Sequence, residues 1–243
     1  MEIIDDLEAE QDRLGVILKA LDAQGWTTES LAAGWTVCDV VLHLAQSEEA
    51  AAATVTAPVG TRTRASEPTG VDDAAERMVL SQRAAAHEVF DRWRRACDNF
   101  IAGLRQADPS QLVQWVGGSL KPATLATTRL AEHWAHGLDI AGALEVPFPD
   151  TDRLHHIAWL GHRTLPYAFT LDGREPPDVY CELTAPSGGT WRFGSETAES
   201  SISGDAGSFC RVGAQRLRPE DSGLVATGPH ARTALGLLRN YAA

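Results

Sequence analysis

Residues 129–140 read Arg-Leu-Ala-Glu-His-Trp-Ala-His-Gly-Leu-Asp-Ile, and this stretch indicates chemistry as well as architecture. Its apolar residues recur at helical spacing around Glu132 and His136, which lie four positions apart. Positions i and i+4 of a helix project from the same face, about one turn apart. A carboxylate and an imidazole stacked in this way can bind one metal ion. A third ligand from a neighbouring helix would leave open positions on the metal, as in catalytic zinc sites.

His43 is the candidate third ligand. It lies in residues 34–45, Gly-Trp-Thr-Val-Cys-Asp-Val-Val-Leu-His-Leu-Ala, where Thr36 and Asp39 predict a capping-box-like helix start. The helix predicted from this start runs to about Ala57 and has His43 two turns from its beginning. Taken alone, a histidine on an apolar helix face is more often a buried core residue than a metal ligand.

Two alternatives for the Glu–His pair follow from the same helix. His133 is a rival ligand, but it projects about 100° away from Glu132, so His136 fits better. The pair could also be a surface contact worth only a few tenths of a kcal/mol. Apolar neighbours such as Leu130 and Trp134 argue against a solvated surface.

The remaining N-terminal segments predict a four-helix bundle. Amphipathic spacing predicts helices over residues 2–22, over 71–107 as one long helix, and over 122–144, which carries the Glu–His pair. The Pro-, Gly- and Thr-containing residues 58–70 predict a loop. Four helices of this length, with these breaks, are typical of a bundle.

The pattern changes after about residue 170. Residues 178–184 and 190–193 alternate between apolar and polar, and Pro186-Ser-Gly-Gly between them predicts a hairpin turn. A third strand over 200–203 and helices over 205–216 and 229–241 complete a small α+β unit. A helix predicted over 151–170 is not assigned by its pattern to either part. The predicted domains are 1–148, a metal-binding helical bundle, and 149–243, the α+β domain.

Composition excludes several classes of protein. The chain has 243 residues and a net charge of −12, so we expect no nucleic-acid partner. No apolar run is long enough for a membrane span, and the acidic N-terminus is unlike a secretory signal, which predicts a cytoplasmic protein without membrane contact. The four cysteines show no metal-ligand spacing and are predicted to be small buried residues. They are Cys38, Cys97, Cys181 and Cys210.

At these motifs the chain resembles a known family. Residues 34–45 resemble the N-terminal signature of the mycothiol-dependent maleylpyruvate isomerases, a branch of the DinB-like four-helix metalloproteins, and residues 129–140 resemble the second half of that signature. Residues 179–228 are similar to the family's small α+β domain, itself like sterol-carrier proteins. Within the family, the chain is most similar to an actinobacterial subgroup described only as metal-binding.

The resemblance implies a mainly α fold with an α+β part, namely a DinB-like bundle followed by a small sterol-carrier-protein-like domain. It implies zinc held by His43, Glu132 and His136 at an interdomain cleft, with mycothiol as co-substrate; nickel or iron would also suit these ligands. An arginine of the small domain is expected to help hold an anionic substrate. Arg216 is the candidate catalytic residue, and Arg211 and Arg218 compete with it for this role. For all three arginines the alternative is a solvated charge at a helix end.

The predicted function is that of a metal-dependent isomerase or S-transferase. A metal lowers the pKa of a bound thiol, and the thiolate would attack an electrophilic small molecule. Two alternatives stay open, a hydrolase with metal-bound water and a non-catalytic metal-bearing protein that binds a small ligand. Asp139 and Gln46 are candidates to orient the ligand histidines.

Overall fold

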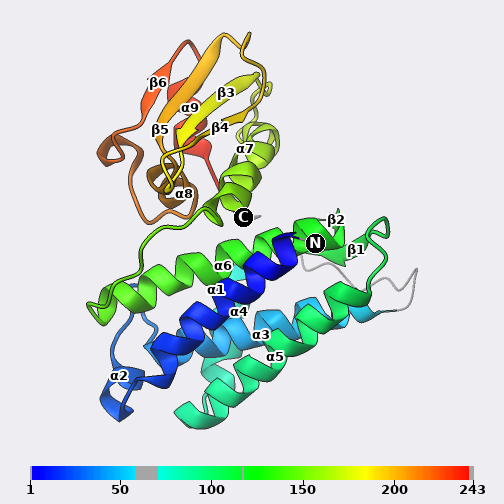
Figure 1. Cartoon of the computed structure of the whole chain (residues 1–243), viewed down its shortest axis with the longest axis vertical. Helices are drawn as coiled ribbons and strands as arrows, with labels where there is room; N and C mark the ends of the chain where they lie inside the picture. The colour runs from blue at the N-terminus through cyan, green and yellow to red at the C-terminus, as the bar shows by residue number, and fades with distance from the viewer. Residues whose placement is uncertain (1, 58–70, 117, 241–243) are drawn as a thin grey trace. The chain divides into compact units, whose positions relative to one another are not determined.

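In the computed structural model (Figure 1), residues 2–57, 71–116 and 118–240 are described, and the predicted loop over 58–70 lies outside them. The chain divides between Phe148 and Pro149 into two compact units. Among the described residues, the first unit is helical apart from one small hairpin, and the second contains helices and a four-stranded sheet. The predicted fold class, mainly α with a small α+β part, is confirmed.

The first unit is a four-helix bundle. Helix α3 packs against α5, α1 packs against α6, and contacts between α1 and α5 and between α3 and α6 close the bundle (Figure 1). Short elements join these helices. The elements are α1 (Glu2–Lys19), α2 (Ala23–Thr27), α3 (Val37–Thr56), α4 (Val71–Ser81), α5 (Ala86–Gln106), β1 (Val113–Trp115), β2 (Gly118–Leu120) and α6 (Pro122–Ala143).

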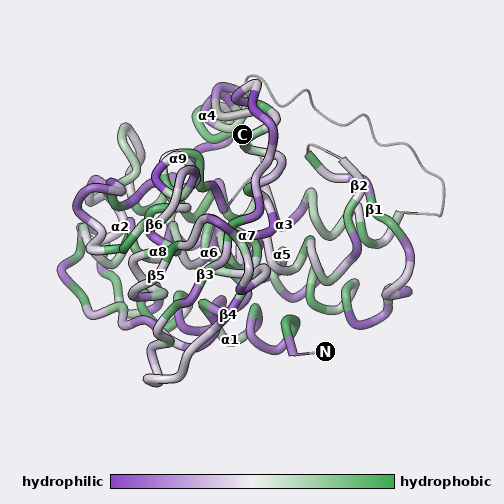
Figure 2. The backbone as a smooth tube through the Cα atoms, turned by 90° about the horizontal axis from the view of Figure 1, so that it is seen from above, coloured by the Kyte–Doolittle hydropathy of each residue, from purple (hydrophilic) through white to green (hydrophobic). Residues whose placement is uncertain are grey.

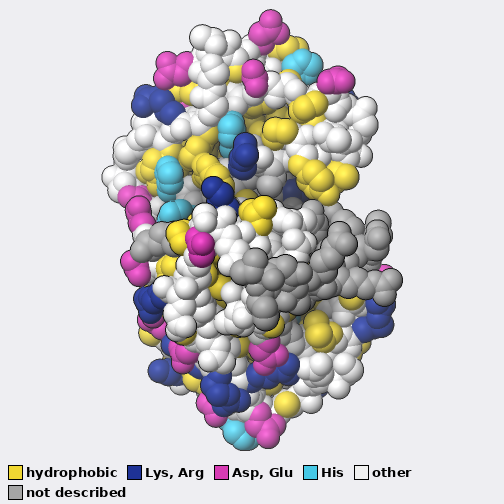
Figure 3. All heavy atoms as spheres, turned by 90° about the vertical axis from the view of Figure 1, so that its right-hand side faces the viewer, with side chains coloured by type: hydrophobic (Ala, Val, Ile, Leu, Met, Phe, Trp, Pro, Cys, Tyr) yellow, Lys and Arg dark blue, Asp and Glu magenta, His cyan; other side chains and the backbone are white. Residues whose placement is uncertain are grey.

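Each long helix buries one stripe of apolar side chains in the bundle core. Along α5, Val89, Trp93, Phe100 and Leu104 are almost completely buried, with Trp93 at 0% exposure. Figure 2 shows hydrophobic and hydrophilic residues alternating along this helix, as an amphipathic segment requires. On the face drawn in Figure 3, basic side chains of the helical unit lie among acidic ones.

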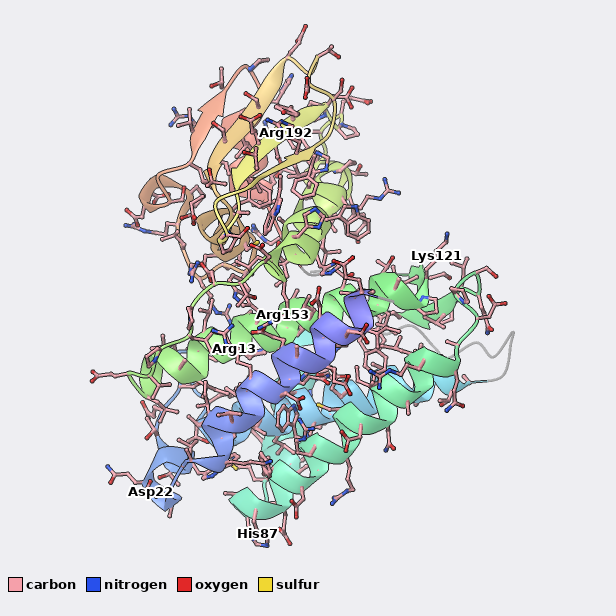
Figure 4. All side chains as sticks on the ribbon, viewed as in Figure 1. Arg13, Asp22, His87, Lys121, Arg153 and Arg192 are labelled. Atoms are coloured by element: carbon pink, nitrogen blue, oxygen red, sulfur yellow. The ribbon has the colours of Figure 1, made fainter. Side chains whose placement is uncertain are left out.

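Local capping explains where the helices begin. The predicted capping box of α3 is confirmed, because the Asp39 amide donates to Thr36 Oγ1 at 3.2 Å and the Thr36 amide donates to Asp39 Oδ2 at 3.0 Å. At α2, labelled Asp22 (Figure 4) accepts a hydrogen bond from the Gly25 amide at 2.8 Å.

Two expectations for the bundle are corrected. The single helix predicted over 71–107 is broken into α4 and α5 at residues 82–85. Arg83 leaves the helical path there and donates to both Asp39 oxygens, at 2.7 and 2.9 Å, while Glu88 accepts from the Ala85 amide and caps α5. The hairpin of β1 and β2, paired from Val113↔Leu120 onward, was not predicted.

The second unit is a sheet with three helices. Its strands lie in the order β4-β3-β5-β6, where β3 and β4 form the predicted antiparallel hairpin and β3 and β5 are parallel. Helices α8 and α9 contact β5, and α7 contacts both of them, so the helix predicted over 151–170 packs in this unit. The elements are α7 (Leu154–Leu171), β3 (Val179–Thr184), β4 (Thr190–Phe193), β5 (Ser200–Asp205), α8 (Ala206–Gly213), the 3-10 turn η1 (Pro219–Asp221), β6 (Val225–Thr227) and α9 (Ala231–Leu237).

Helix α8 is shorter than predicted. It ends at Gly213, and Gln215 adopts a left-handed backbone conformation with φ 60°, so the predicted helix to Arg216 is corrected. Arg216 therefore lies in the turn that follows the helix. In the described part of the chain, no helix combines the length and hydrophobicity that crossing a membrane requires.

Candidate metal centre

Three side chains predicted as metal ligands meet inside the helical unit. His43 projects from α3, and Glu132 and His136 project from successive turns of α6. Glu132 Oε2 lies 3.7 Å from His43 Nε2 and 3.7 Å from His136 Nε2. One potential ligand atom of each residue lies within 4.8 Å of the other two. The fold therefore brings the three residues together.

The spacing of these atoms suits a shared cation better than direct hydrogen bonds. At 3.7 Å, both imidazole nitrogens are beyond hydrogen-bond distance from the Glu132 carboxylate oxygen. Ligand atoms that share a zinc ion at about 2.0–2.2 Å lie about 3.3–3.6 Å apart in a tetrahedral site. Two imidazoles and a carboxylate are also ligands that zinc accepts. The donor set and its geometry thus fit a small divalent cation.

Asp139 holds His136 in the tautomer that a metal ligand needs. The Nδ1 atom of His136 lies 3.0 Å from Asp139 Oδ2, and the Asp139 side chain is 1% exposed. An ionised carboxylate only accepts, so Nδ1 donates to Asp139, and Nε2 is the ring atom that faces Glu132. Gln46, the other predicted orienting residue, lies elsewhere, because its amide donates to the Met78 carbonyl and to Gln82.

Trp35 packs beside the two ligand imidazoles. Its ring centroid lies 5.0 Å from that of His43 and 6.3 Å from that of His136. The side chains of His43, Glu132 and His136 remain 17%, 27% and 12% exposed, so small molecules can reach the site. Trp134, in contrast, is buried in the bundle core.

The protonation states also favour metal binding. Burial lowers the pKa of His43, and the adjacent His136 lowers it further, against the opposing effect of Glu132. Burial raises the pKa of Glu132, but the interaction with His43 and the positive charge of Arg129 outweigh it, so the pKa lies well below its ordinary value. Near neutral pH, therefore, His43 is a neutral imidazole with a free lone pair and Glu132 is a carboxylate.

A buried polar network lies next to the three side chains. Arg129 Nε donates to Glu48 Oε1 at 2.8 Å, and the two side chains are 5% and 0% exposed. The rival ligand His133 belongs to this network and is turned away from the other histidines. Its Nδ1 donates to the Arg129 carbonyl at 2.9 Å, and its Nε2 accepts from Trp93 Nε1 at 3.2 Å. Burial and the charge of Arg129 lower the pKa of His133 to about 3.

The arginines of the small unit differ in their surroundings. Arg211 donates to both carboxylate oxygens of Asp150, and Arg218 pairs with Asp221. Arg216 donates to the Ala214 carbonyl at 2.8 Å. Together with Arg218 and Arg239 it lines a cavity of about 320 Å³ whose walls also include apolar side chains of the same unit.

Comparisons with known proteins agree with this architecture. An uncharacterized protein of Mycobacterium tuberculosis, found in strains H37Rv and CDC 1551, is 35% identical over 244 residues, covering 98% of this chain and 94% of the relative. The crystal structure of the mycothiol-dependent maleylpyruvate isomerase shares the fold at 15% identity, with a TM-score of 0.61 over 94% of this chain and 95% of that chain. A histidine-to-alanine mutant of that isomerase matches with the same TM-score at 14% identity.

The family match covers the segment that contains all three candidate ligands. The family model described as the mycothiol maleylpyruvate isomerase N-terminal domain matches residues 7–141. This range includes α3 and almost all of α6. The chain belongs to the mycothiol maleylpyruvate isomerase N-terminal domain family.

Proposed function

We propose that this protein is a metal-dependent enzyme that uses a small-molecule thiol, with zinc bound by His43, Glu132 and His136. The convergence of two histidine Nε2 atoms on one carboxylate oxygen, each at 3.7 Å, carries the proposal. Three protein ligands leave positions for outside molecules, as in catalytic zinc sites. Nickel or iron would accept the same ligands. We choose zinc because two histidines and one carboxylate are a common ligand set of catalytic zinc.

The nucleophile is proposed to be an external thiol, namely mycothiol. Burial raises the pKa of all four cysteine thiols of the chain, that of Cys181 to about 12, so none is a ready thiolate. The family name and the matched isomerase structures both refer to mycothiol. When bound, the metal would lower the pKa of such a thiol so that thiolate forms near neutral pH.

The residues of the chain have separate tasks in this proposal. His43 and His136 would bind the metal through Nε2, and ionised Glu132, whose pKa lies well below its ordinary value, would supply one negative charge. Asp139 keeps the Nδ1 proton of His136 in place. The site carries a net charge of +1 with a divalent cation, which favours a thiolate over the neutral thiol.

The substrate is proposed to be a small electrophile that carries negative charge. Arg216 lies in the wall of the cavity described above, and a guanidinium group is suited to binding a carboxylate. Addition of a thiolate to the activated double bond of an unsaturated acid, rotation about the resulting single bond, and elimination of the thiolate would isomerise the acid. Displacement of a leaving group by the thiolate would instead give S-transfer.

Metal titration is the direct test of the ligand set. The metal-free protein is titrated with zinc against a chromophoric chelator, for the wild type, for His43→Ala and for His87→Ala. His87 is an exposed histidine at the start of α5 (Figure 4), and its replacement is expected to leave affinity unchanged. His43→Ala is expected to lose at least two orders of magnitude, since one of three ligands disappears.

Thiol binding is tested on the same protein with cobalt in place of zinc. Addition of mycothiol is expected to produce a thiolate-to-cobalt charge-transfer band, and maleylpyruvate with mycothiol is then assayed for isomerisation. Absence of the band in a cobalt-loaded protein would contradict the thiol step and favour hydrolysis or simple ligand binding. Equal zinc affinity of wild type and His43→Ala would contradict the ligand set itself.

A further inference from the structure

Arg129 links the two helices that carry the proposed metal ligands. It lies on α6, three residues before Glu132, and its side chain reaches across to α3. There Nε donates to Glu48 Oε1 at 2.8 Å and Nη2 donates to Ser47 Oγ at 2.7 Å. The guanidinium therefore holds two neighbouring side chains of α3 at once.

The same contacts continue to His43. Ser47 lies one turn after His43 on α3, and its hydroxyl donates to the His43 carbonyl at 2.9 Å. Arg129 thus contacts a residue that is hydrogen-bonded to the turn of α3 that carries one ligand. Its own backbone carbonyl accepts from His133, which is the neighbour of Glu132. The network is therefore hydrogen-bonded to the backbone of α3 at His43 and to the backbone of α6 one turn before Glu132.

Stability alone does not explain this buried ion pair. Both side chains are almost completely buried, and Glu48 Oε2 has no hydrogen-bond partner among the described residues. Removing two charges from water costs several kcal/mol, and an apolar pair of similar volume is often equally stabilising or better. A buried pair of this kind is more readily explained if it fixes how two helices pack. Because this pair joins α3 and α6 beside the ligands, it would fix the packing of the two ligand-bearing helices.

We propose that Arg129 and Glu48 are positioning residues of the metal centre, an inference that rests on the proposed function. They set the register and rotation of α3 against α6, so that His43 Nε2 and Glu132 Oε2 lie 3.7 Å apart. Glu48 also balances the charge of Arg129. Without it, the guanidinium would repel a cation and attract Glu132 away from the histidines.

A paired replacement separates positioning from folding. Glu48→Leu combined with Arg129→Met removes both charges without leaving either one buried alone. The matched control is Glu49→Leu with Arg92→Met, because this pair also joins two helices, with contacts of 2.7 Å, but connects α3 to α5. For each protein, zinc affinity, the urea unfolding of the metal-free chain and the absorption spectrum of the cobalt form are measured.

We expect the Glu48/Arg129 double variant to unfold at the wild-type urea concentration or above, yet to bind zinc about 10–100-fold more weakly and to show an altered cobalt spectrum. The control pair is expected to keep wild-type affinity and spectrum. Ser47→Ala removes the Nη2 contact and the hydroxyl hydrogen bonds to the carbonyls of His43 and Leu44, and it is expected to weaken zinc binding severalfold in a folded protein. It therefore provides a second reading if the double variant does not fold.

The outcomes distinguish this inference from the proposed function. A folded double variant with wild-type zinc affinity and an unchanged cobalt spectrum would overturn the positioning role, and so would unchanged affinity in Ser47→Ala. Equal losses in the control pair would also overturn it, since the effect would then be general. A wild-type chain that takes up no metal would contradict the proposed function and this inference together.

Discussion

Asp139 offers the most quantitative test of how the centre is held. Its Oδ2 accepts the Nδ1 proton of His136 at 3.0 Å from a side chain that is 1% exposed. Asp139→Asn keeps the size and an acceptor oxygen but removes the charge. Hydrogen bonds to charged groups contribute about 1.5–3 kcal/mol and neutral ones about 0.5–1.5 kcal/mol. The difference of about 1–1.5 kcal/mol corresponds to a loss of about tenfold in zinc affinity.

The assay is a competition titration of the metal-free protein with zinc and a chelator at pH 7.5. Asp12→Asn serves as the control, because Asp12 pairs with Arg94 at 3.1 Å on the surface of the bundle. Urea unfolding of each metal-free variant shows whether the fold is kept. Affinity within twofold of the wild type in a folded Asp139→Asn protein would refute the orienting role. A tenfold loss in Asp12→Asn would show that the effect is not specific.

Three further outcomes are expected. Burial lowers the pKa of His133 to about 3 in the folded chain, whereas an unfolded histidine titrates near pH 6.5. Between these pH values only the unfolded chain binds this proton. The free energy of unfolding therefore falls as the pH drops from 6.5 towards 3. In zinc-free protein, His133→Gln should reduce the dependence of the unfolding free energy on pH by about 1.4 kcal/mol per pH unit. Urea titrations at pH 7 and 5 that give the same pH dependence for this variant and the wild type would contradict this prediction. Arg216→Met should raise the KM for an anionic substrate at least tenfold without changing zinc affinity, whereas an unchanged KM in steady-state assays would remove Arg216 from the substrate site. A methyl group at Gly137 would overlap the Phe148 ring. Alanine normally favours a helix over glycine, but here the overlap should lower the free energy of unfolding of Gly137→Ala by about 1–3 kcal/mol. Adding Phe148→Leu should restore this loss. A more stable Gly137→Ala protein would show that the ring moves aside.

Local patterns predicted the parts of the fold that depend on neighbours in sequence. The capping box at Thr36 and Asp39 involves residues three positions apart, and its geometry follows from their types. The stacking of Glu132 and His136 follows from their i,i+4 spacing on α6. The meeting of His43 with that pair depends on helix packing, so the local pattern made His43 only a candidate, and the family resemblance implied that it completes the ligand set.

Features that depend on distant partners were missed. The break between α4 and α5 at residues 82–85 is accompanied by the pairing of Arg83 with Asp39, which lies 44 positions away. Arg129 and Glu48 are 81 positions apart, and each alone reads as an ordinary charged residue of a helix. No local pattern shows that two such charges are buried together, so the network beside the ligands became visible only in the folded chain.

We propose that side chains from α3 and α6 share one cation. Crystals of the zinc-loaded protein, measured above and below the zinc absorption edge, test it directly. We expect a single anomalous peak about 2.0–2.2 Å from His43 Nε2, from His136 Nε2 and from a Glu132 carboxylate oxygen. A zinc-loaded crystal with no peak among these three side chains, or with zinc bound by other residues, would contradict it.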